Sequence, residues 1–284
     1  MKKNVLNTDL SGKVAVVTGA GGVLCSVMAK DLARAGAKVA LLNRTFEKAK
    51  AVEEAILAEG GIAKAYACNV LDKNMVEEVA KQVKADLGPC DILLNGAGGN
   101  NPRATTDKEY YESGDIDSDV KTFFDLEESG VEAVFNLNFL GTLIPTQAFA
   151  KQMLGRKGCS ILNISSMNAY TPLTKIPAYS GAKAAVSNFT QWLAVHFSKE
   201  GIRVNAIAPG FFATAQNKAL LFNEDGTPTP RTGKILAATP MGRFGDSETE
   251  LSGALLFLLN NEAAGFITGV TLPVDGGFSA YSGV

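Results

Sequence analysis

Three residues near the middle of the chain could together move a proton to or from an alcohol or carbonyl oxygen. Tyr179 and Lys183 stand four apart in a helical pattern, so both side chains leave one face of that helix, and Ser166 ends an apolar run upstream. A phenol titrates near ~10, and a neighbouring ammonium is expected to lower the Tyr179 pKa. A serine hydroxyl can hydrogen-bond the oxygen that exchanges the proton. Such Tyr–Lys pairs also arise by chance on helices. Whether this pair is catalytic therefore depends on the strands, helices and motifs that surround it.

Composition excludes several classes of function. The chain has 284 residues, of which 46% are apolar, enough for one large α/β domain. A net charge of −2 gives no electrostatic basis for binding nucleic acid. The single histidine, His196, supports neither a histidine metal centre nor a Ser-His-Asp triad and is interpreted as structural or exposed. We therefore expect no metal and no nucleic-acid partner.

The location of the protein is also constrained. No apolar run approaches ~18 residues and the N-terminus is polar, so we expect a cytoplasmic protein that does not enter membranes. The cysteines lack metal-ligand spacing and are interpreted as small buried hydrophobic residues in a reducing compartment. They are Cys25, Cys68, Cys90 and Cys159.

Apolar, β-branched runs alternate with helical patterns along the sequence. The expected strands are 14–18, 38–42, 62–67, 91–95, 159–164, 203–207 and 270–274. The expected helices are 26–35, 46–59, 72–87, 131–153, 178–198 and 248–259. This alternation predicts an α/β, single-domain Rossmann fold over residues 1–284, a doubly wound parallel sheet of about seven strands with helices on both faces.

A glycine cluster follows the first expected strand and opens the first helix. Glycines there let the backbone approach a pyrophosphate, and a helix N-terminus offers free N–H groups. The alternative is a tight strand–helix turn without a ligand, but a position after the first strand of an α/β sheet favours a nucleotide. The expected contacts are Thr18, Gly19, Gly21, Gly22, Val23 and Leu24.

These motifs together resemble one family. The sequence is similar to the short-chain dehydrogenase/reductases over essentially its whole length, which implies a nicotinamide cofactor and hydride transfer to or from a carbonyl or alcohol carbon. The motifs that carry the resemblance, in order, are Thr18-Gly19, Asn95-Gly96-Ala97-Gly98, Asn138, Ser166, Tyr179/Lys183, Pro209-Gly210 and Asp275-Gly276-Gly277.

The resemblance implies a role for each catalytic position. Tyr179 would be the general acid–base, and Lys183 would lower its pKa and hold the nicotinamide ribose. Ser166 would position the substrate oxygen, and Asn138 would hold a water of the proton relay. Cofactor contacts are also implied at Asn69, Val70, Asn95, Gly96, Ala97, Gly98, Pro209, Gly210, Phe212 and Thr214, the last meeting the carboxamide.

The sequence differs from the family pattern in four places. Val23 and Cys25 stand where the family usually has glycines, so Val23 must fit where the backbone runs close to the diphosphate. Gly96 takes the second position of the usual Asn-Asn-Ala-Gly motif. Asn69 replaces the acidic residue usual after the third strand, and it can still donate and accept toward an adenine edge.

The end of the second strand bears on the choice of nicotinamide. NAD-binding proteins usually carry an acidic residue there for the ribose hydroxyls, whereas this protein has Asn43 followed by Arg44. A guanidinium beside an uncharged amide suits a 2′-phosphate and favours NADP(H). NAD(H) stays possible because Arg44 can also stack over adenine, and in a third interpretation Arg44 merely caps a solvated turn.

Two polar segments are candidates for substrate recognition. An insertion at about 99–130 is longer than is usual for the family, and a segment at about 214–243 has the composition of a lid. Both would lie beside the carboxyl ends of strands, where ligands bind. Either could instead be a surface feature or an oligomer contact.

Polar side chains gather near the expected mouth, which favours a sugar acid over a lipid or steroid. Arg103 and Lys175 are the candidate cations for a carboxylate, although either could instead be a solvated surface charge, and Asn168 is a candidate partner for hydroxyl groups. The expected substrate contacts are thus Arg103, Ser166, Asn168, Lys175 and Tyr179.

The substrate-side motifs sharpen the resemblance. Segments 98–106, 165–169, 171–179 and 277–284 are similar to the D-mannonate oxidoreductases of the short-chain type, also called fructuronate reductases. That similarity implies interconversion of D-fructuronate and D-mannonate. Gluconate 5-dehydrogenases and other sugar-acid or polyol dehydrogenases are the alternatives to exclude.

Two further interpretations are open. A catalytically silent nucleotide-binding scaffold is disfavoured by the intact catalytic residues, and a reductase of apolar ketones by the polar insertion. The family resemblance also implies a homotetramer in which helices 131–153 and 178–198 pack across a two-fold axis, with the 278–281 tail in a second contact.

Overall fold

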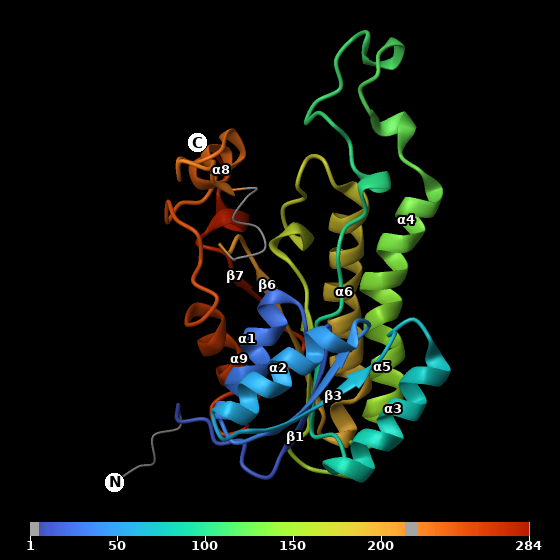
Figure 1. Ribbon diagram of the computed structural model, residues 1–284, viewed down its shortest axis with the longest axis vertical. Helices are drawn as coiled ribbons and strands as arrows, with labels where there is room; N and C mark the ends of the chain where they lie inside the picture. The colour runs from blue at the N-terminus through green and yellow to red at the C-terminus, as the bar shows by residue number, and fades with distance from the viewer. Residues whose placement is uncertain (1–5, 214–220, 284) are drawn as a thin grey trace.

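A computed structural model describes residues 6–213 and 221–283 of the protein, in which seven strands form one parallel sheet (Figure 1). Along the sheet the strands lie in the order β3-β2-β1-β4-β5-β6-β7. They are β1 (Val14–Thr18), β2 (Lys38–Asn43), β3 (Ile62–Ala67), β4 (Ile92–Asn95), β5 (Ser160–Ile164), β6 (Arg203–Pro209) and β7 (Thr271–Val274). The order reverses between β1 and β4, which opens a crevice at their carboxyl ends.

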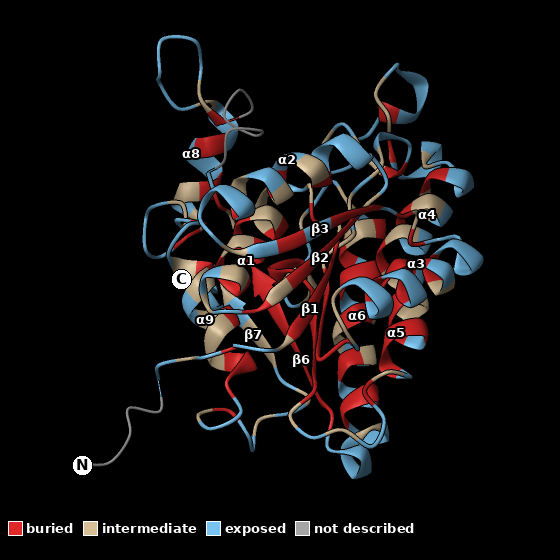
Figure 2. Ribbon diagram, turned by 60° about the horizontal axis from the view of Figure 1, so that its bottom comes forward, coloured by how far each residue is buried: buried red, intermediate tan, exposed pale blue. Residues whose placement is uncertain are grey.

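Helices cover both faces of the sheet, and the predicted doubly wound Rossmann fold is confirmed. One face carries α1 (Val23–Arg34), α2 (Phe46–Ala58) and α9 (Glu250–Leu259). The other carries α3 (Lys73–Asp86), α5 (Gly141–Ala150) and α6 (Pro177–His196), with α4 (Glu128–Phe135) leading into α5. Figure 2 shows the sheet as a buried layer between these helices.

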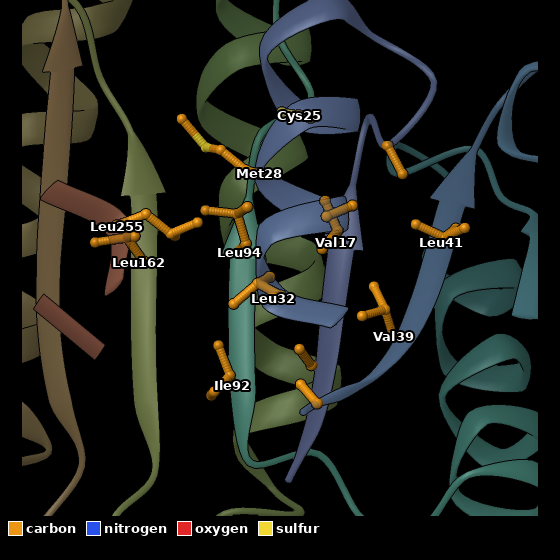
Figure 3. Close-up of a cluster of buried hydrophobic side chains, with 14 of the residues drawn as sticks. Val17, Cys25, Met28, Leu32, Val39, Leu41, Ile92, Leu94, Leu162 and Leu255 are labelled. Atoms are coloured by element: carbon orange, nitrogen blue, oxygen red, sulfur yellow. The ribbon is translucent and has the colours of Figure 1, made fainter. Parts of the chain in front are cut away.

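The core explains why the central strands are apolar throughout. Every residue of β1, β4 and β5 is buried, because each strand has a helix layer on both sides. Figure 3 shows one of the two apolar layers, in which Met28 and Leu32 of α1 lie over Val17 and Leu94 of the sheet. The predicted buried state of the four cysteines, all in the described part of the protein, is confirmed.

The expected continuous helix 131–153 is wrong in detail. The structure has α4, then a π-helical turn over Asn136–Leu140, then α5. Pro145 lies inside α5, where it has no N–H to donate to the preceding turn, and such an imbalance accompanies a change of helical register. The wider turn places Asn138, which is fully buried, beside the crevice.

Both segments predicted to recognise substrate have local structure. The insertion contains 3-10 turns at Pro102–Ala104, Asp115–Asp117 and Phe123–Asp125. The segment predicted as a lid contains a helix that was not among the predicted elements, α8 (Pro230–Ala237), which is N-capped by the Thr229 side chain. Residues 214–220 of that segment, with the predicted carboxamide contact Thr214, lie outside the described residues.

Candidate active site

The carboxyl ends of β4 and β5 and the first turns of α6 bring the predicted catalytic residues together. Tyr179 and Lys183 leave the same face of α6, and the Lys183 ammonium lies 5.6 Å from the centre of the Tyr179 ring. Ser166, just beyond β5, lies close enough to the Tyr179 phenol to lower its pKa. The arrangement has the parts needed for proton transfer at a carbonyl or alcohol oxygen.

Burial dominates the acid–base behaviour of this site. It raises the pKa of Tyr179, and the Ser166 hydrogen bond only partly opposes that rise. It also lowers the pKa of Lys183 to about 8, with the nearby Cys25 acting in the opposite direction. The predicted lowering of the Tyr179 pKa by Lys183 is thus not found in the protein alone, because desolvation of the phenolate is the dominant influence on that pKa.

Lys183 and Asn138 are held by backbone groups. The Lys183 ammonium donates to the Ile164 carbonyl at 2.8 Å, at the end of β5. The Asn138 amide nitrogen donates to the carbonyls of Gly99 and Val134, each at 2.8 Å, and its oxygen accepts from the Gly99 N–H at 3.3 Å. Asn138 therefore fixes the start of the insertion, and the water-holding role implied for it stays a prediction.

A cavity of about 550 Å³ opens beside this site. Fourteen of the positions predicted to contact cofactor line it: Gly19, Gly21, Gly22, Val23, Leu24, Asn43, Arg44, Asn69, Val70, Gly96, Ala97, Gly98, Tyr179 and Lys183. The cavity lining also includes eight residues that were not predicted: Cys25, Thr45, Lys48, Cys68, Leu71, Gly99, Leu137 and Ile164. Their positions in the sequence could have indicated them. Each is next to a predicted site residue, lies four residues from one, or is the last residue of a strand.

Other predicted cofactor positions lie behind the cavity wall. Thr18 is fully buried, and its hydroxyl oxygen accepts from the N–H groups of Gly96 and Ala97 at 3.0 and 3.3 Å. Asn95 is buried and donates to Thr146 and Asn163. The Thr18 side chain thus joins the end of β1 to the loop after β4, and the Asn95 side chain joins β4 to β5 and α5. Neither residue lines the cavity.

The remaining positions lie beyond β6. Pro209 and Phe212 are buried, and Gly210 lies against the backbone of Asp275, which a Cβ at position 210 would meet at 2.6 Å. None of these three residues lines the 550 Å³ cavity. A cofactor contact at Pro209, Gly210 or Phe212 stays a prediction.

The crevice fits a dinucleotide because of its own backbone geometry. Gly19 has a φ of +65°, and a Cβ there would come within 2.9 Å of the Ala97 backbone. Helix α1 begins at Val23 with Gly22 as its N-cap, and among the described residues no side chain caps it. Its first N–H groups and the positive end of its dipole are thus available to a diphosphate. When bound, a nicotinamide dinucleotide supplies or accepts the hydride.

The fold accommodates Val23 and Cys25, the two residues that replace the usual glycines of the turn. Val23 becomes the first residue of α1 and is half-buried. Cys25 packs against Gly96, where an added Cβ would collide with the Cys25 sulfur. A bulkier residue at position 25 is therefore balanced by the absence of a side chain at position 96, where the family usually has asparagine.

The corner expected to meet the adenosine ribose carries cations instead of a carboxylate. The Asn43 amide oxygen accepts from the Gly21 N–H at 3.3 Å, and its nitrogen donates to the Thr45 carbonyl at 2.8 Å. Arg44 and Lys48 are exposed at the cavity rim. The Asn43 side chain thus bridges two turns, and both cations face solvent at the rim of the cavity.

The predicted substrate cations both contact the insertion. Arg103 hydrogen-bonds Ser129 at 3.1 Å and pairs with Glu127 at 3.6 Å. The Lys175 ammonium donates to the Asp107 carbonyl at 2.6 Å. Asn168 differs, because it is 4% exposed and its side-chain oxygen has no hydrogen-bond partner among the described residues.

Comparison with known proteins identifies the family. The family model for short chain dehydrogenases matches residues 13–225. The protein belongs to the short-chain dehydrogenase/reductases. It is 63% identical to an uncharacterized oxidoreductase of Haemophilus influenzae over 98% of this chain and 97% of that protein. It is 35% identical to a gluconate 5-dehydrogenase of Gluconobacter oxydans over 95% of this chain and 96% of that enzyme.

A solved structure makes the likeness three-dimensional. A Haemophilus influenzae protein named as a candidate D-mannonate oxidoreductase, with bound NAD, superposes with a TM-score of 0.94 at 62% identity. The superposition covers 99% of this chain and 100% of that one. This protein is therefore an NAD(P)-dependent dehydrogenase that acts on CH–OH groups of a small molecule.

The remaining expectations concern membranes and metals. Among the described residues, no helix is both long and apolar enough to cross a membrane. Within the same ranges, no group of three or more His, Cys, Asp or Glu side chains is arranged to hold a metal ion. The predicted cytoplasmic location stays a prediction.

Proposed function

We propose that this dehydrogenase interconverts D-fructuronate and D-mannonate. The observation that carries the proposal is the polar wall beside Ser166, where the buried Asn168 oxygen lacks a donor among the described residues. A buried acceptor without a partner is costly, and a substrate hydroxyl would satisfy it. The likeness to the protein named as a candidate D-mannonate oxidoreductase supports the same substrate class.

The site residues divide the work of the reaction. The Ser166 hydroxyl orients the C5 carbonyl oxygen of fructuronate, and Tyr179 donates a proton to that oxygen as hydride reaches the carbon. The Lys183 ammonium stabilises the phenolate that remains. Asn168 holds a neighbouring substrate hydroxyl, and Asn138 keeps Gly99 and the adjoining loop in place.

Steady-state reduction of D-fructuronate by the purified protein tests the proposal, with 5-ketogluconate as the competing substrate. We expect a higher kcat/KM for fructuronate. Turnover restricted to 5-ketogluconate would move the enzyme to the gluconate 5-dehydrogenases, which the 35% identity to such an enzyme makes the second candidate. Dinucleotide binding without turnover of any sugar acid would instead indicate the silent scaffold.

We also propose that NADP(H) is the favoured cofactor. Arg44, just before α2, and Lys48, in its first turn, supply two cations at the cavity rim, and Asn43 places no carboxylate beside them. NAD(H) is the alternative, since the similar Haemophilus influenzae structure holds NAD. Parallel assays with NADPH and NADH decide between them. We expect Arg44→Ala with Lys48→Ala to remove most of the preference for NADPH, and an unchanged ratio of efficiencies would contradict the proposal.

A homotetramer is the assembly that we propose. Helices α5 and α6 present an apolar groove of about 450 Å³ in which Phe189, Trp192 and His196 stack on one another. Trp192 is 56% exposed and Val195 is 77% exposed. Large apolar side chains that are exposed together on one surface often mark a protein–protein contact. Light scattering should show four copies for the wild type and fewer for Trp192→Asp.

A further inference from the structure

An ion pair joins two segments that lie far apart in the sequence. The Lys234 ammonium of α8 donates to the Glu109 carboxylate of the insertion at 2.6 Å. Figure 1 shows the insertion on one side of the top of the molecule and α8 on the other, with the segment that leads into α6 between them. The pair therefore connects the two flanks of the carboxyl edge of the sheet.

Topology fixes what this connection crosses. The insertion follows β4 and α8 follows β6, and in the sheet β5 lies between these two strands. Ser166 comes two residues after β5 and acts on the pKa of Tyr179. A bridge from the insertion to α8 thus passes over the strand end that carries the catalytic serine.

The insertion side of the bridge is firmly attached close to Glu109. The Lys175 ammonium donates to the Asp107 carbonyl at 2.6 Å, and the Thr106 N–H donates to the Lys175 carbonyl at 3.0 Å. Lys175 lies in the loop that leads into the Tyr179 helix. Glu109 is therefore held two residues beyond an anchor on the catalytic loop.

The α8 side is attached mainly along one face. Thr232 and Ile235 are buried, and the Thr232 hydroxyl donates to the Leu221 carbonyl at 2.5 Å. Lys234, on the opposite face, has a side chain that is 69% exposed, whereas the Glu109 side chain is 30% exposed. The pair thus holds the outer face of α8 toward the insertion.

We propose that Glu109 and Lys234 latch the insertion to α8, and that the resulting strap retains substrate at the Ser166–Tyr179 site. Glu109 is then a positioning residue that acts through Lys234. The choice of substrate for the test rests on the proposed function, but the latch itself does not.

The electrostatics agree with a latch that is closed at neutral pH. The hydrogen bond from Lys234 lowers the pKa of Glu109, and the charges of Lys234 and Lys175 act in the same direction. Glu109 therefore stays ionised, and the pair weakens only as the pH falls through that lowered pKa.

The latch is tested first without substrate, by hydrogen exchange of the α8 amides in the full-length protein. We expect Glu109→Gln and Lys234→Met each to raise exchange over 230–237 by about twofold to fivefold, the range of a partly exposed ion pair. The double variant should show no further increase, because either change already removes the pair. Exchanging the two charges, Glu109→Lys with Lys234→Glu, should restore slow exchange.

A matched control separates the latch from a general loosening of the insertion. Glu112 pairs with Lys108 at 2.6 Å entirely within the insertion. Glu112→Gln should leave α8 exchange as in the wild type. Exchange that is unchanged in both latch variants, or raised equally by Glu112→Gln, would overturn the proposal.

Steady-state kinetics then test the effect on catalysis. We expect the latch variants to raise KM for D-fructuronate with kcat unchanged or higher, and to leave dinucleotide affinity as in the wild type. A fall in kcat at constant KM would contradict a retaining strap. If the wild-type protein turns over no fructuronate, the proposed function fails while the exchange experiment still decides the latch.

Discussion

The cofactor cleft and the proposed substrate mouth of this dehydrogenase are held together by different kinds of interaction. The cleft is formed by strand ends, glycines and the uncapped start of α1, with Gly19 fixed by its φ of +65° and its approach to Ala97. The mouth is formed by an insertion and a helix that side-chain contacts hold together, among them Lys175 to Asp107 and Lys234 to Glu109. Backbone geometry therefore sets the first region, and long-range side-chain pairs set the second.

The two regions meet beside the predicted catalytic residues, and each region has a buried polar group there. Lys183 lines the cleft and is 4% exposed, and Asn168 lies on the substrate side and is also 4% exposed. A charged or incompletely bonded group is buried at both places, which costs stability unless a ligand compensates. The comparison thus predicts that function and stability oppose each other where the two regions meet.

The largest effect is expected at Tyr179. Tyr179→Phe keeps the ring but removes the proton donor, so turnover should fall about 10³-fold while dinucleotide affinity survives. Stopped-flow kinetics and cofactor titration measure the two quantities. Tyr170→Phe is the control, since the Tyr170 hydroxyl donates to the Thr271 carbonyl outside the catalytic group. Wild-type turnover in Tyr179→Phe would contradict the assignment of Tyr179 as the proton donor.

The next effect concerns Lys183 and the pH dependence of stability. Because its folded pKa is about 8 against an ordinary 10.5, the unfolded protein binds more protons between these values, and this residue's contribution makes stability rise with pH. Below pH 8 its buried charge costs the full amount, about 3 kcal/mol. Lys183→Met should therefore gain stability relative to the wild type at pH 7, and the gain should shrink toward pH 10.5.

Urea unfolding across this pH range measures the Lys183 effect, and Lys199→Met controls for loss of an exposed lysine. A gap between Lys183→Met and the wild type that does not depend on pH would show that burial does not shift the Lys183 pKa. Activity should be lost in Lys183→Met at every pH, whichever way the stability changes.

A smaller effect is expected for Ala substitutions at two glycines. Their comparison separates the cost of a positive φ from the cost of a steric contact in the cleft. Gly12 and Gly19 both have positive φ, but a Cβ at Gly12 meets nothing within 4 Å. Gly12→Ala should cost about 1 kcal/mol from backbone strain alone. Gly19→Ala should cost about 2 kcal/mol or more and also weaken dinucleotide binding, because Ala97 must move. Equal losses in thermal unfolding and titration would mean that the approach to Ala97 is unimportant.

The smallest effect tests the substrate side. Asn168→Leu removes the unpartnered amide oxygen, so the free energy of unfolding should stay the same or rise. The KM for D-fructuronate should increase about tenfold, the equivalent of one lost hydrogen bond of about 1.4 kcal/mol. A loss of stability with an unchanged KM would show that Asn168 serves the fold and not the substrate.

Element types were predicted well because they depend on local pattern. The seven strands lie where apolar runs indicated, with ends that differ by one or two residues, and the glycine that ends α1, Gly36, has a φ of +96°. The break in the 131–153 helix was missed, because a helical hydrophobic pattern does not distinguish a π turn from an α turn. Helix α8 was missed because its short amphipathic pattern follows a segment rich in proline and glycine.

The sequence by itself determined the alternation of strands and helices, the glycine turn and the Ser166–Tyr179–Lys183 set, since each follows from local spacing or backbone conformation. Only the tertiary structure decided the direction of the Tyr179 pKa shift and the pairing of Arg103 and Lys175 with residues of the insertion. It alone also joined Glu109 to Lys234. Burial and ion pairing depend on which distant segments share space, and no local pattern in the sequence encodes that.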